Sequence, residues 1–266
     1  MSFEVIVLGG GRMGRAVADG LRRARPDVSL LVVQRGREKA EDLTTHLAPV
    51  PVETEIRAEH VGENTSVILC VKPDHAEAAL RGVARFGVRR VLSVVAGLAS
   101  ARLEAALPDG AAVVRAMPNT PAAIGAGVSA MSGGAYCTAA DLEWAEGVLG
   151  ALGTVVRVPE SKLDAVSALS GAMPAYVYLV VEALVEAGVH QGLSREVSAQ
   201  LVGDTLSGSA ELLRRSGESP EALRHAVTSP GGLTAAGLRI LESRAVRSAF
   251  LEAVAAAAER SRQLGR

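Results

Sequence analysis

The chain opens with a short apolar run that leads directly into a glycine-rich turn. Residues 3–8 read FEVIVL and residues 9–14 read GGGRMG. A run that is apolar at nearly every position predicts a strand covered on both faces, as in the centre of a parallel sheet. After the turn, Met13, Val17 and Leu21 recur every four residues and predict a helix with one apolar face. This order of strand, glycine turn and helix is typical of a dinucleotide-binding site.

Strand-like and helix-like segments continue to alternate as far as residue 158. We expect further strands at 28–33, 66–71, 90–94, 111–115 and 154–158, with helices at 37–47, 74–86, 100–107 and 138–150. Such alternation predicts an α/β fold with a Rossmann-type, doubly wound and mostly parallel sheet. Beyond Pro159 only helical periodicity remains, and we expect helices at 161–187 (bent at Pro174), 194–215, 219–228, 234–243 and 245–263. The sequence therefore predicts a Rossmann domain at 1–158 and an all-α domain at 159–266.

Charge and cysteine content restrict the partners. Lys and Arg number 28 against 29 Asp and Glu, so the formal net charge is -1. A chain with this balance has no overall attraction to nucleic acid or to an anionic membrane, which favours a small-molecule partner. The two cysteines, Cys70 and Cys137, form no metal-binding pattern, and we expect a reducing cytoplasm.

The first predicted helix of the all-α domain is unusually apolar. It contains PAYVYLVVEALVEAGV, in which Glu182 and Glu186 are the charged residues. We interpret this helix as too polar to span a membrane and as buried partly between subunits. A small helical domain with this much apolar surface predicts a homodimer with interleaved helices.

The glycines of the turn have separate expected roles at a nucleotide. Gly9 permits the tight turn, Gly11 lets the backbone approach a pyrophosphate, and Gly14 allows the helix to pack closely on the strand. Gly10 fills a position that we expect to be unconstrained. The amides at the start of the helix, which include those of Arg12 and Met13, would then face the anion.

The end of the second predicted strand indicates which nucleotide binds. An NAD site carries an acidic residue there that holds the ribose 2′-hydroxyl, whereas this chain reads Gln34-Arg35-Gly36-Arg37. No carboxylate is present to repel a 2′-phosphate, and Arg35 and Arg37 can pair with one. We therefore expect Gln34, Arg35 and Arg37 to contact NADPH, with NADH binding more weakly.

The later strands end in short segments that we also expect at the cofactor, because ligands of open α/β sheets lie beyond the carboxyl ends of the strands. Two prolines flank Asn119 and Thr120 and fix the backbone where a nicotinamide would lie. Asn119 can present donors to the substrate or to the carboxamide. The expected contacts at these strand ends are Val71, Lys72, Pro73, Ala96, Gly97, Met117, Pro118 and Asn119.

Taken together, these motifs resemble the pyrroline-5-carboxylate reductase family over essentially the whole chain. They are GGGRMG at 9–14, VKP at 71–73, RAMPNTP at 115–121, DAVSALSG at 164–171 with PAYVYLVVEAL after it, EAGVHQGLSR at 186–195 and TSPGGLT at 228–234. The resemblance implies an oxidoreductase of amino-acid biosynthesis that uses NADPH to reduce the cyclic imine L-1-pyrroline-5-carboxylate to L-proline. It also implies a helical dimerisation domain, composite active sites and larger assemblies of dimers.

By the same resemblance, the backbone amides of Ser229, Gly231 and Gly232 bind the substrate carboxylate, and Thr234 donates a hydrogen bond to the imine nitrogen. Glycines can expose successive N–H groups to an anion, and Thr234 stands at the start of a predicted helix, whose dipole favours the carboxylate. Holding C5 of the substrate over C4 of the nicotinamide would provide most of what hydride transfer requires, without a strong protein acid.

The sequence departs from the family pattern near the expected substrate site. Ala172-Met173 replace the Ser-Gly of the usual SGSGPAY, Leu233 replaces a threonine, and Arg57 replaces an asparagine near the adenosine. Because Met173 could reshape the substrate pocket, a reductase of a piperideine carboxylate or a substituted pyrroline stays open as an alternative.

Two other classes of protein also stay open. A β-hydroxyacid dehydrogenase would need a lysine on the long interdomain helix as its acid/base group, and Lys162 is the only lysine there. A non-catalytic NADPH-binding sensor would show no turnover with any cyclic imine.

Overall fold

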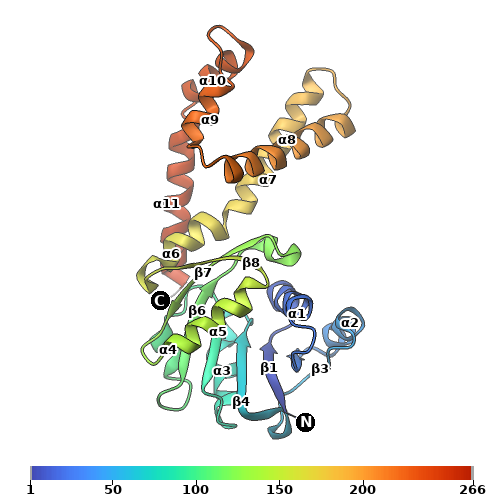
Figure 1. The fold of residues 1–266 in the computed structure, drawn as a ribbon, viewed down its shortest axis with the longest axis vertical. Coiled ribbons are helices and arrows are strands. Elements are labelled where there is room, and N and C mark those ends of the chain that lie inside the picture. Colours follow the sequence, from blue (N-terminus) through green and yellow to red (C-terminus); the bar gives the residue numbers. More distant parts are fainter. Residues whose placement is uncertain (1, 265–266) are drawn as a thin grey trace. The chain divides into compact units, whose positions relative to one another are not determined.

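The computed structural model describes residues 2–264, and the chain divides into two compact units. The first unit comprises residues 1–172 with 256–266, and the second comprises residues 173–255. Figure 1 shows a sheet flanked by helices in the first unit and helices alone in the second. Residue 1 and residues 265–266, at the ends of the two predicted domains, lie outside the described residues.

The first unit is built on one eight-stranded sheet with the order β3-β2-β1-β4-β5-β6-β7-β8. Neighbouring strands are parallel except for β6 and β7, which are antiparallel. The order reverses beside β1, and the crevice at such a point is where open α/β sheets bind ligands. The strands are β1 (Phe3–Leu8), β2 (Leu30–Val33), β3 (Val52–Glu53), β4 (Val61–Leu69), β5 (Arg90–Ser93), β6 (Ala112–Met117), β7 (Gly127–Gly133) and β8 (Gly153–Arg157).

Strand β1 is buried on both faces because it lies in the middle of the sheet. Val5 and Val7 contribute to one hydrophobic core, which includes Leu21 of helix α1 (Arg12–Ala24). Ile6 contributes to a second core, which includes Leu80 of helix α3 (Pro73–Ala84). Successive side chains of a strand point to opposite faces, so each face of the sheet has its own core. These cores confirm the predicted doubly wound α/β class.

The remaining helices of the first unit cover the two faces. Helices α2 (Arg37–Leu47) and α5 (Ala139–Gly150) contribute to the same core as α1, and α4 (Ser100–Glu104) contributes to the core of α3. Short helical turns complete the unit, namely η1 (Ala58–His60), η2 (Thr120–Ile124), η3 (Glu160–Lys162), α6 (Leu163–Val166) and the π turn η4 (Ser167–Gly171).

Strands β3 and β7 are absent from the sequence prediction, which was wrong at both places. Strand β7 reads GVSAMSG, and its small side chains and terminal glycines carry little strand propensity. Antiparallel pairing with β6 and parallel pairing with β8 supply its hydrogen bonds instead. A two-residue strand such as β3 leaves no periodic pattern in the sequence.

The second unit contains the helices that follow the π turn. They are α7 (Met173–His190), α8 (Arg195–Ser216), α9 (Pro220–Ala226), α10 (Leu233–Ser243) and α11 (Val246–Leu264), the last of which ends in the first unit. The single bent helix expected at 161–187 is four pieces, because η3, α6 and the π turn precede α7. The expected Ser194 cap is present, and its hydroxyl accepts a hydrogen bond from Val197 N. The domain boundary expected after residue 158 stays a prediction.

Apolar side chains cover much of the surface of the second unit. Within 173–255, only Val185 and Ser198 are buried. Those left exposed include Tyr178, Leu179, Leu184, Leu201, Leu212, Ile240, Leu241 and Leu251. An exposed apolar surface of this extent marks an interaction site.

One helical stretch, Glu160–His190, is long and apolar enough to cross a membrane by length and composition alone, with a mean hydropathy of 1.6. The expectation that it is too polar was therefore wrong. By length and composition, Glu182 and Glu186 therefore do not exclude a membrane span.

Candidate functional site

The glycine turn after β1 leaves no room for side chains at three of its positions. Gly9 has a φ of 99°, and a Cβ there would lie 2.8 Å from the carbonyl oxygen of Cys70. A Cβ on Gly14 would overlap the carbonyl oxygen of Gly9, so helix α1 packs against the turn. Around Gly11, by contrast, a Cβ would meet open space. The turn is therefore tight inside and accessible at Gly11, as a bound pyrophosphate requires.

The second glycine, Gly10, is constrained, and the expectation of an unconstrained position was wrong. A Cβ on Gly10 would overlap Cδ1 of Leu43 on α2. Its backbone N–H donates a 2.9 Å hydrogen bond to Oε1 of Gln34, which follows β2. The Gln34 side chain, predicted only as a cofactor contact, thus holds the turn to the end of the neighbouring strand.

The start of helix α1 offers free donors to an anion. Gly11 is the N-cap and supplies no side-chain cap, and the first turn contains no acidic residue. The first amides of a helix have no partner within the helix, so those from Arg12 onward are available to a ligand. Arg12 is exposed at this end, whereas Met13 packs partly against the core.

A cavity of about 600 Å³ lies beside this turn, at the carboxyl ends of β1, β2 and β4. Six predicted cofactor residues line it, namely Gly9, Gly11, Gln34, Arg35, Val71 and Lys72. Sequence reasoning missed a further set, which includes Lys39, Thr54, Glu55, Ile56 and His75. The signal for Lys39 is its place in the first turn of α2, next to the predicted arginines.

The cationic residues of the cavity differ from the predicted pair. Arg35 and Lys39 line the cavity, whereas the exposed Arg37, which begins α2, does not. Residues two positions apart on a helix point in different directions, so Lys39 can face the cavity while Arg37 faces away from it. Arg35 and Lys39 thus remain next to the cavity for a 2′-phosphate, and Lys72 and Arg85 line the cavity as well.

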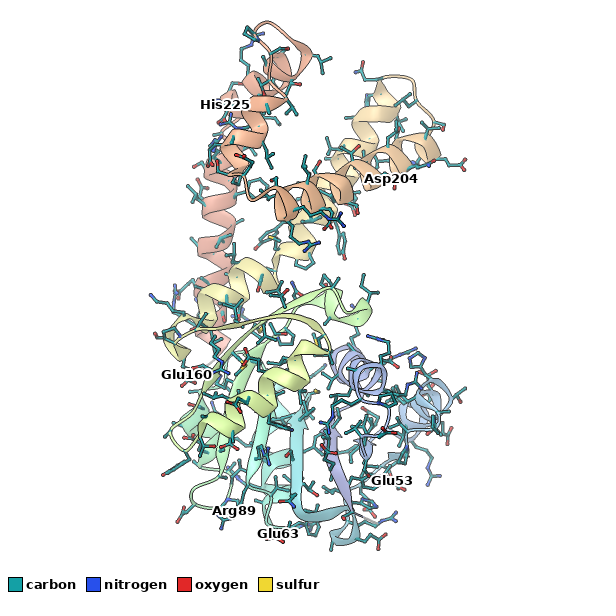
Figure 2. The ribbon with its side chains drawn as sticks, viewed as in Figure 1. Glu53, Glu63, Arg89, Glu160, Asp204 and His225 are labelled. Atoms are coloured by element: carbon teal, nitrogen blue, oxygen red, sulfur yellow. The ribbon has the colours of Figure 1, made fainter. Side chains whose placement is uncertain are left out.

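Arg57 has its own carboxylate partners. Its guanidinium lies 3.3 Å from Glu55, 3.6 Å from Glu53 and 3.7 Å from Glu59. Figure 2 labels Glu53, the last residue of β3, on the flank of the sheet near α2. Because carboxylates of its own loop surround it, Arg57 adds little free charge to the cavity that Glu55 lines.

The other predicted strand-end residues lie at the same edge of the sheet, outside the walls of this cavity. Pro73 begins α3, and Ala96 and Gly97 follow β5. Met117 ends β6, and Pro118 follows it as a buried residue. Since β1, β4, β5 and β6 are parallel neighbours, their carboxyl ends form one continuous edge beside the glycine turn.

Asn119 is buried, and its carboxamide has two backbone partners. Nδ2 donates a 3.2 Å hydrogen bond to the carbonyl oxygen of Ser170, and Oδ1 accepts a 2.9 Å bond from Val128 N. The side chain that we expected to face the substrate or the carboxamide therefore joins three segments of the first unit.

Cys70 is one of the residues that line the cavity. Burial raises the pKa of Cys70 to about 12, so the thiol stays protonated at neutral pH. Across the described residues, no group of three or more His, Cys, Asp and Glu is placed to hold a metal ion.

Three of the predicted substrate residues, Ser229, Gly231 and Gly232, lie in the second unit, in the loop before α10. Gly231 has a φ of 71°, and Gly232 N donates a 3.1 Å hydrogen bond to Ser229 O. Gly232 is the N-cap of α10, which places the half-buried Thr234 in the first turn of that helix. Leu233 is 90% exposed, and Met173, at the start of α7, is exposed as well.

Family models match both parts of the chain. The model for pyrroline-5-carboxylate reductase dimerisation matches residues 160–264. The model for NADP oxidoreductase, coenzyme F420-dependent, matches residues 4–97, which contain the glycine turn and much of the cavity.

Full-length relatives carry the same description. The chain is 41% identical to pyrroline-5-carboxylate reductase of Mycobacterium tuberculosis, over 98% of this chain and 96% of that protein. It is 37% identical to the Synechocystis enzyme of the same name, over 100% of both. A crystal structure of Plasmodium falciparum pyrroline carboxylate reductase with NADP bound matches with a TM-score of 0.87 and 29% identity, over 99% of this chain and 98% of that one. The structure of a pyrroline-5-carboxylate reductase from Coxiella burnetii matches with a TM-score of 0.89 and 30% identity, over 99% of this chain and 99% of that one.

Proposed function

The chain belongs to the pyrroline-5-carboxylate reductase family, and we propose from this premise that it reduces L-1-pyrroline-5-carboxylate to L-proline with NADPH. The observation that carries the proposal is the match to relatives of this name over nearly the whole chain, so that both units are included. The family predicted from the sequence motifs is thereby confirmed.

The first unit fits NADPH. The free amides at the start of α1 suit the pyrophosphate, and Arg35 and Lys39 suit a 2′-phosphate. The cavity of about 600 Å³ is large enough for a bound small molecule. We assign the remaining strand-end residues, from Val71 to Pro118, to the same nucleotide because their strands end at one edge.

When bound, NADPH supplies the hydride that adds to C5 of the imine. The protein's part is to bind and orient the substrate. We assign the backbone amides of Ser229, Gly231 and Gly232 to the substrate carboxylate, since the left-handed Gly231 turns successive amides outward ahead of a helix start. The Thr234 hydroxyl donates a hydrogen bond to the imine nitrogen, which takes up one proton from solvent as the hydride adds to C5 and so becomes the amine of proline.

The chain is a homodimer, as its dimerisation domain implies. We propose that the helices of two subunits interleave, that each active site includes residues of both, and that dimers join into a larger assembly. The exposed apolar side chains of α7 and α8 support this proposal, because a second copy would cover them. The apolar stretch Glu160–His190 lies wholly within the dimerisation match, which favours a protein interface over a membrane. We further propose a cytoplasmic location and no nucleic-acid partner.

A second candidate is a related cyclic imine. Ala172 and Met173 stand where the family usually has serine and glycine, and Met173 is exposed at the start of α7. A longer, flexible side chain at that point would change the shape of a substrate pocket. A six-membered piperideine carboxylate or a substituted pyrroline is then the alternative substrate.

Initial rates of NADPH oxidation test the proposal. Purified protein is assayed with pyrroline-5-carboxylate and with piperideine-6-carboxylate, and each assay is repeated with NADH. We expect kcat/KM to be highest for the five-membered ring with NADPH. Turnover of the six-membered ring alone would establish the second candidate, and no turnover of either imine would favour a β-hydroxyacid dehydrogenase or a nucleotide sensor.

A further inference from the structure

We infer that Asn119 is a positioning residue, which fastens the π turn Ser167–Gly171 to the carboxyl end of β6. Its side chain acts through that turn instead of contacting the cofactor or substrate. The kinetic part of this inference rests on the proposed function, and the structural part does not.

The carbonyl oxygen of Ser170 explains why the turn needs an outside donor. In a continuous α-helix this carbonyl would accept the N–H of the residue four positions later. That residue is Pro174, which has no N–H. The Nδ2 group of Asn119 donates to Ser170 O over 3.2 Å and so satisfies it. A partly buried carbonyl without a partner would cost stability, so this bond holds the turn in place.

Neighbouring contacts fix the orientation of the Asn119 side chain and the position of the π turn. Oδ1 of Asn119 accepts a 2.9 Å hydrogen bond from Val128 N of β7, which orients the carboxamide with Nδ2 toward Ser170. A Cβ on Gly171 would lie 2.9 Å from Cε of Met117, so the turn packs closely on the last residue of β6. Within the turn, Ala172 N donates to Ser167 O over 3.0 Å, the wide spacing of a π turn.

The π turn lies directly before α7, so the hydrogen bond from Asn119 to Ser170 should affect how the substrate is bound. The π turn ends at Gly171, one residue before the first unit ends, and Met173 then begins α7. Ala172 and Met173 are two of the positions at which this chain departs from the family pattern. Because π turns are frequent at functional sites, loosening this one should impair use of the substrate and leave nucleotide binding intact.

The test is a double-mutant cycle of Asn119→Asp and Pro174→Ala in the full-length protein. In Asn119→Asp the new carboxylate can still accept from Val128 N, but when ionised it cannot donate to Ser170 O. Pro174→Ala restores a backbone N–H four residues after Ser170, so this second substitution should rescue the loss. We expect Asn119→Asp to lower kcat/KM for pyrroline-5-carboxylate about tenfold and the double variant to recover most of it. The dissociation constant of NADPH should change less than twofold in every variant.

Hydrogen exchange of the amides of residues 167–173 gives a readout without activity. These amides should exchange about tenfold faster in Asn119→Asp and return toward wild type in the double variant. If Asn119→Asp does not fold, the double variant should fold, and equal failure of both would overturn the inference. Unchanged exchange, or NADPH affinity that falls in parallel with kcat/KM, would overturn it too. Absence of wild-type turnover would contradict the proposed function alone. The hydrogen-exchange measurement does not depend on turnover, so it would still test whether Asn119 holds the π turn.

Discussion

Nη1 of Arg115 lies 2.6 Å from Oε1 of Glu160, so an ion pair joins β6 to the turn that follows β8. The backbone N–H and the hydroxyl of Ser100 each donate a 2.7 Å hydrogen bond to the same carboxylate. Glu160 lies at the opposite flank of the first unit from Glu53 (Figure 2). Burial alone would raise the pKa of Glu160, but the hydrogen bonds from Arg115 and Ser100 together lower it.

This lowered pKa predicts how stability depends on pH. A carboxyl group whose pKa is lower in the folded state stabilises the fold above its unfolded pKa of about 4.3, and this stabilisation is lost as the pH falls through the folded pKa. Replacing Glu160 by glutamine should therefore lower the free energy of unfolding near neutral pH and have a shrinking effect in acid. Urea unfolding of both proteins at one protein concentration, followed by fluorescence of Trp144, measures the difference. A difference independent of pH would contradict the assignment.

The cations at the cavity should decide the preference for NADPH. We expect Arg35→Ala and Lys39→Ala each to raise the KM for NADPH about fivefold, which corresponds to about 1 kcal/mol, and to leave the KM for NADH almost unchanged. Arg37→Ala is the matched control, because Arg37 is exposed and does not line the cavity. Equal increases in the KM for NADPH and the KM for NADH would show that these cations do not bind a 2′-phosphate.

Two glycines of the turn should respond differently to the same substitution. An added Cβ at Gly11 meets open space, so the melting temperature of the Gly11→Ala variant should match that of the wild type. The KM for NADPH should rise about tenfold, because the Cβ would occupy space that the pyrophosphate needs. Alanine at Gly14 would overlap the carbonyl oxygen of Gly9 and should destabilise the fold by about 1–3 kcal/mol. Thermal unfolding and NADPH titration separate the two effects. An unaltered NADPH affinity in Gly11→Ala would argue against a pyrophosphate at this turn.

Thr234 should matter to turnover more than to nucleotide binding. Removing its hydroxyl in Thr234→Ala should lower kcat about tenfold, because a hydrogen bond to the reacting nitrogen is lost, with the KM for NADPH changed less than twofold. Thr234→Ser keeps the hydroxyl and is the control that should retain most of the turnover. Steady-state kinetics of the two variants decide the role, and an unchanged kcat in the alanine variant would remove Thr234 from the mechanism.

How far the sequence predicts the structure depends on the range of the interactions involved. Helix 37–47 and the burial of residues 5–8 follow from local periodicity, and both are present as predicted. Strand β7 was missed because its stability comes from pairing with β6, which is formed by residues elsewhere in the chain. The π turn was missed for a related reason, since the donor that supports Ser170 is Asn119 and lies 51 residues earlier.

In the candidate site, too, the sequence predicts local features and misses those that depend on distant residues. The glycine motif identifies the turn, because Gly9 and Gly14 meet steric demands of the turn and Gly11 leaves open space for a ligand. It does not reveal that Gly10 packs on Leu43, or that Lys39 faces the cavity instead of Arg37, because both depend on how α2 sits against the sheet. The specific loop TSPGGLT was recognised through a family resemblance, and its turn geometry alone would also fit an ordinary helix cap.

The most direct measurement follows the hydride itself. The protein is incubated with pyrroline-5-carboxylate and NADPH that carries deuterium in both positions at C4 of the nicotinamide, and the product is analysed by chiral chromatography and mass spectrometry. We predict L-proline with one deuterium, located at C5. Proline without deuterium, or no proline under conditions in which a six-membered cyclic imine is reduced, would contradict the proposed function.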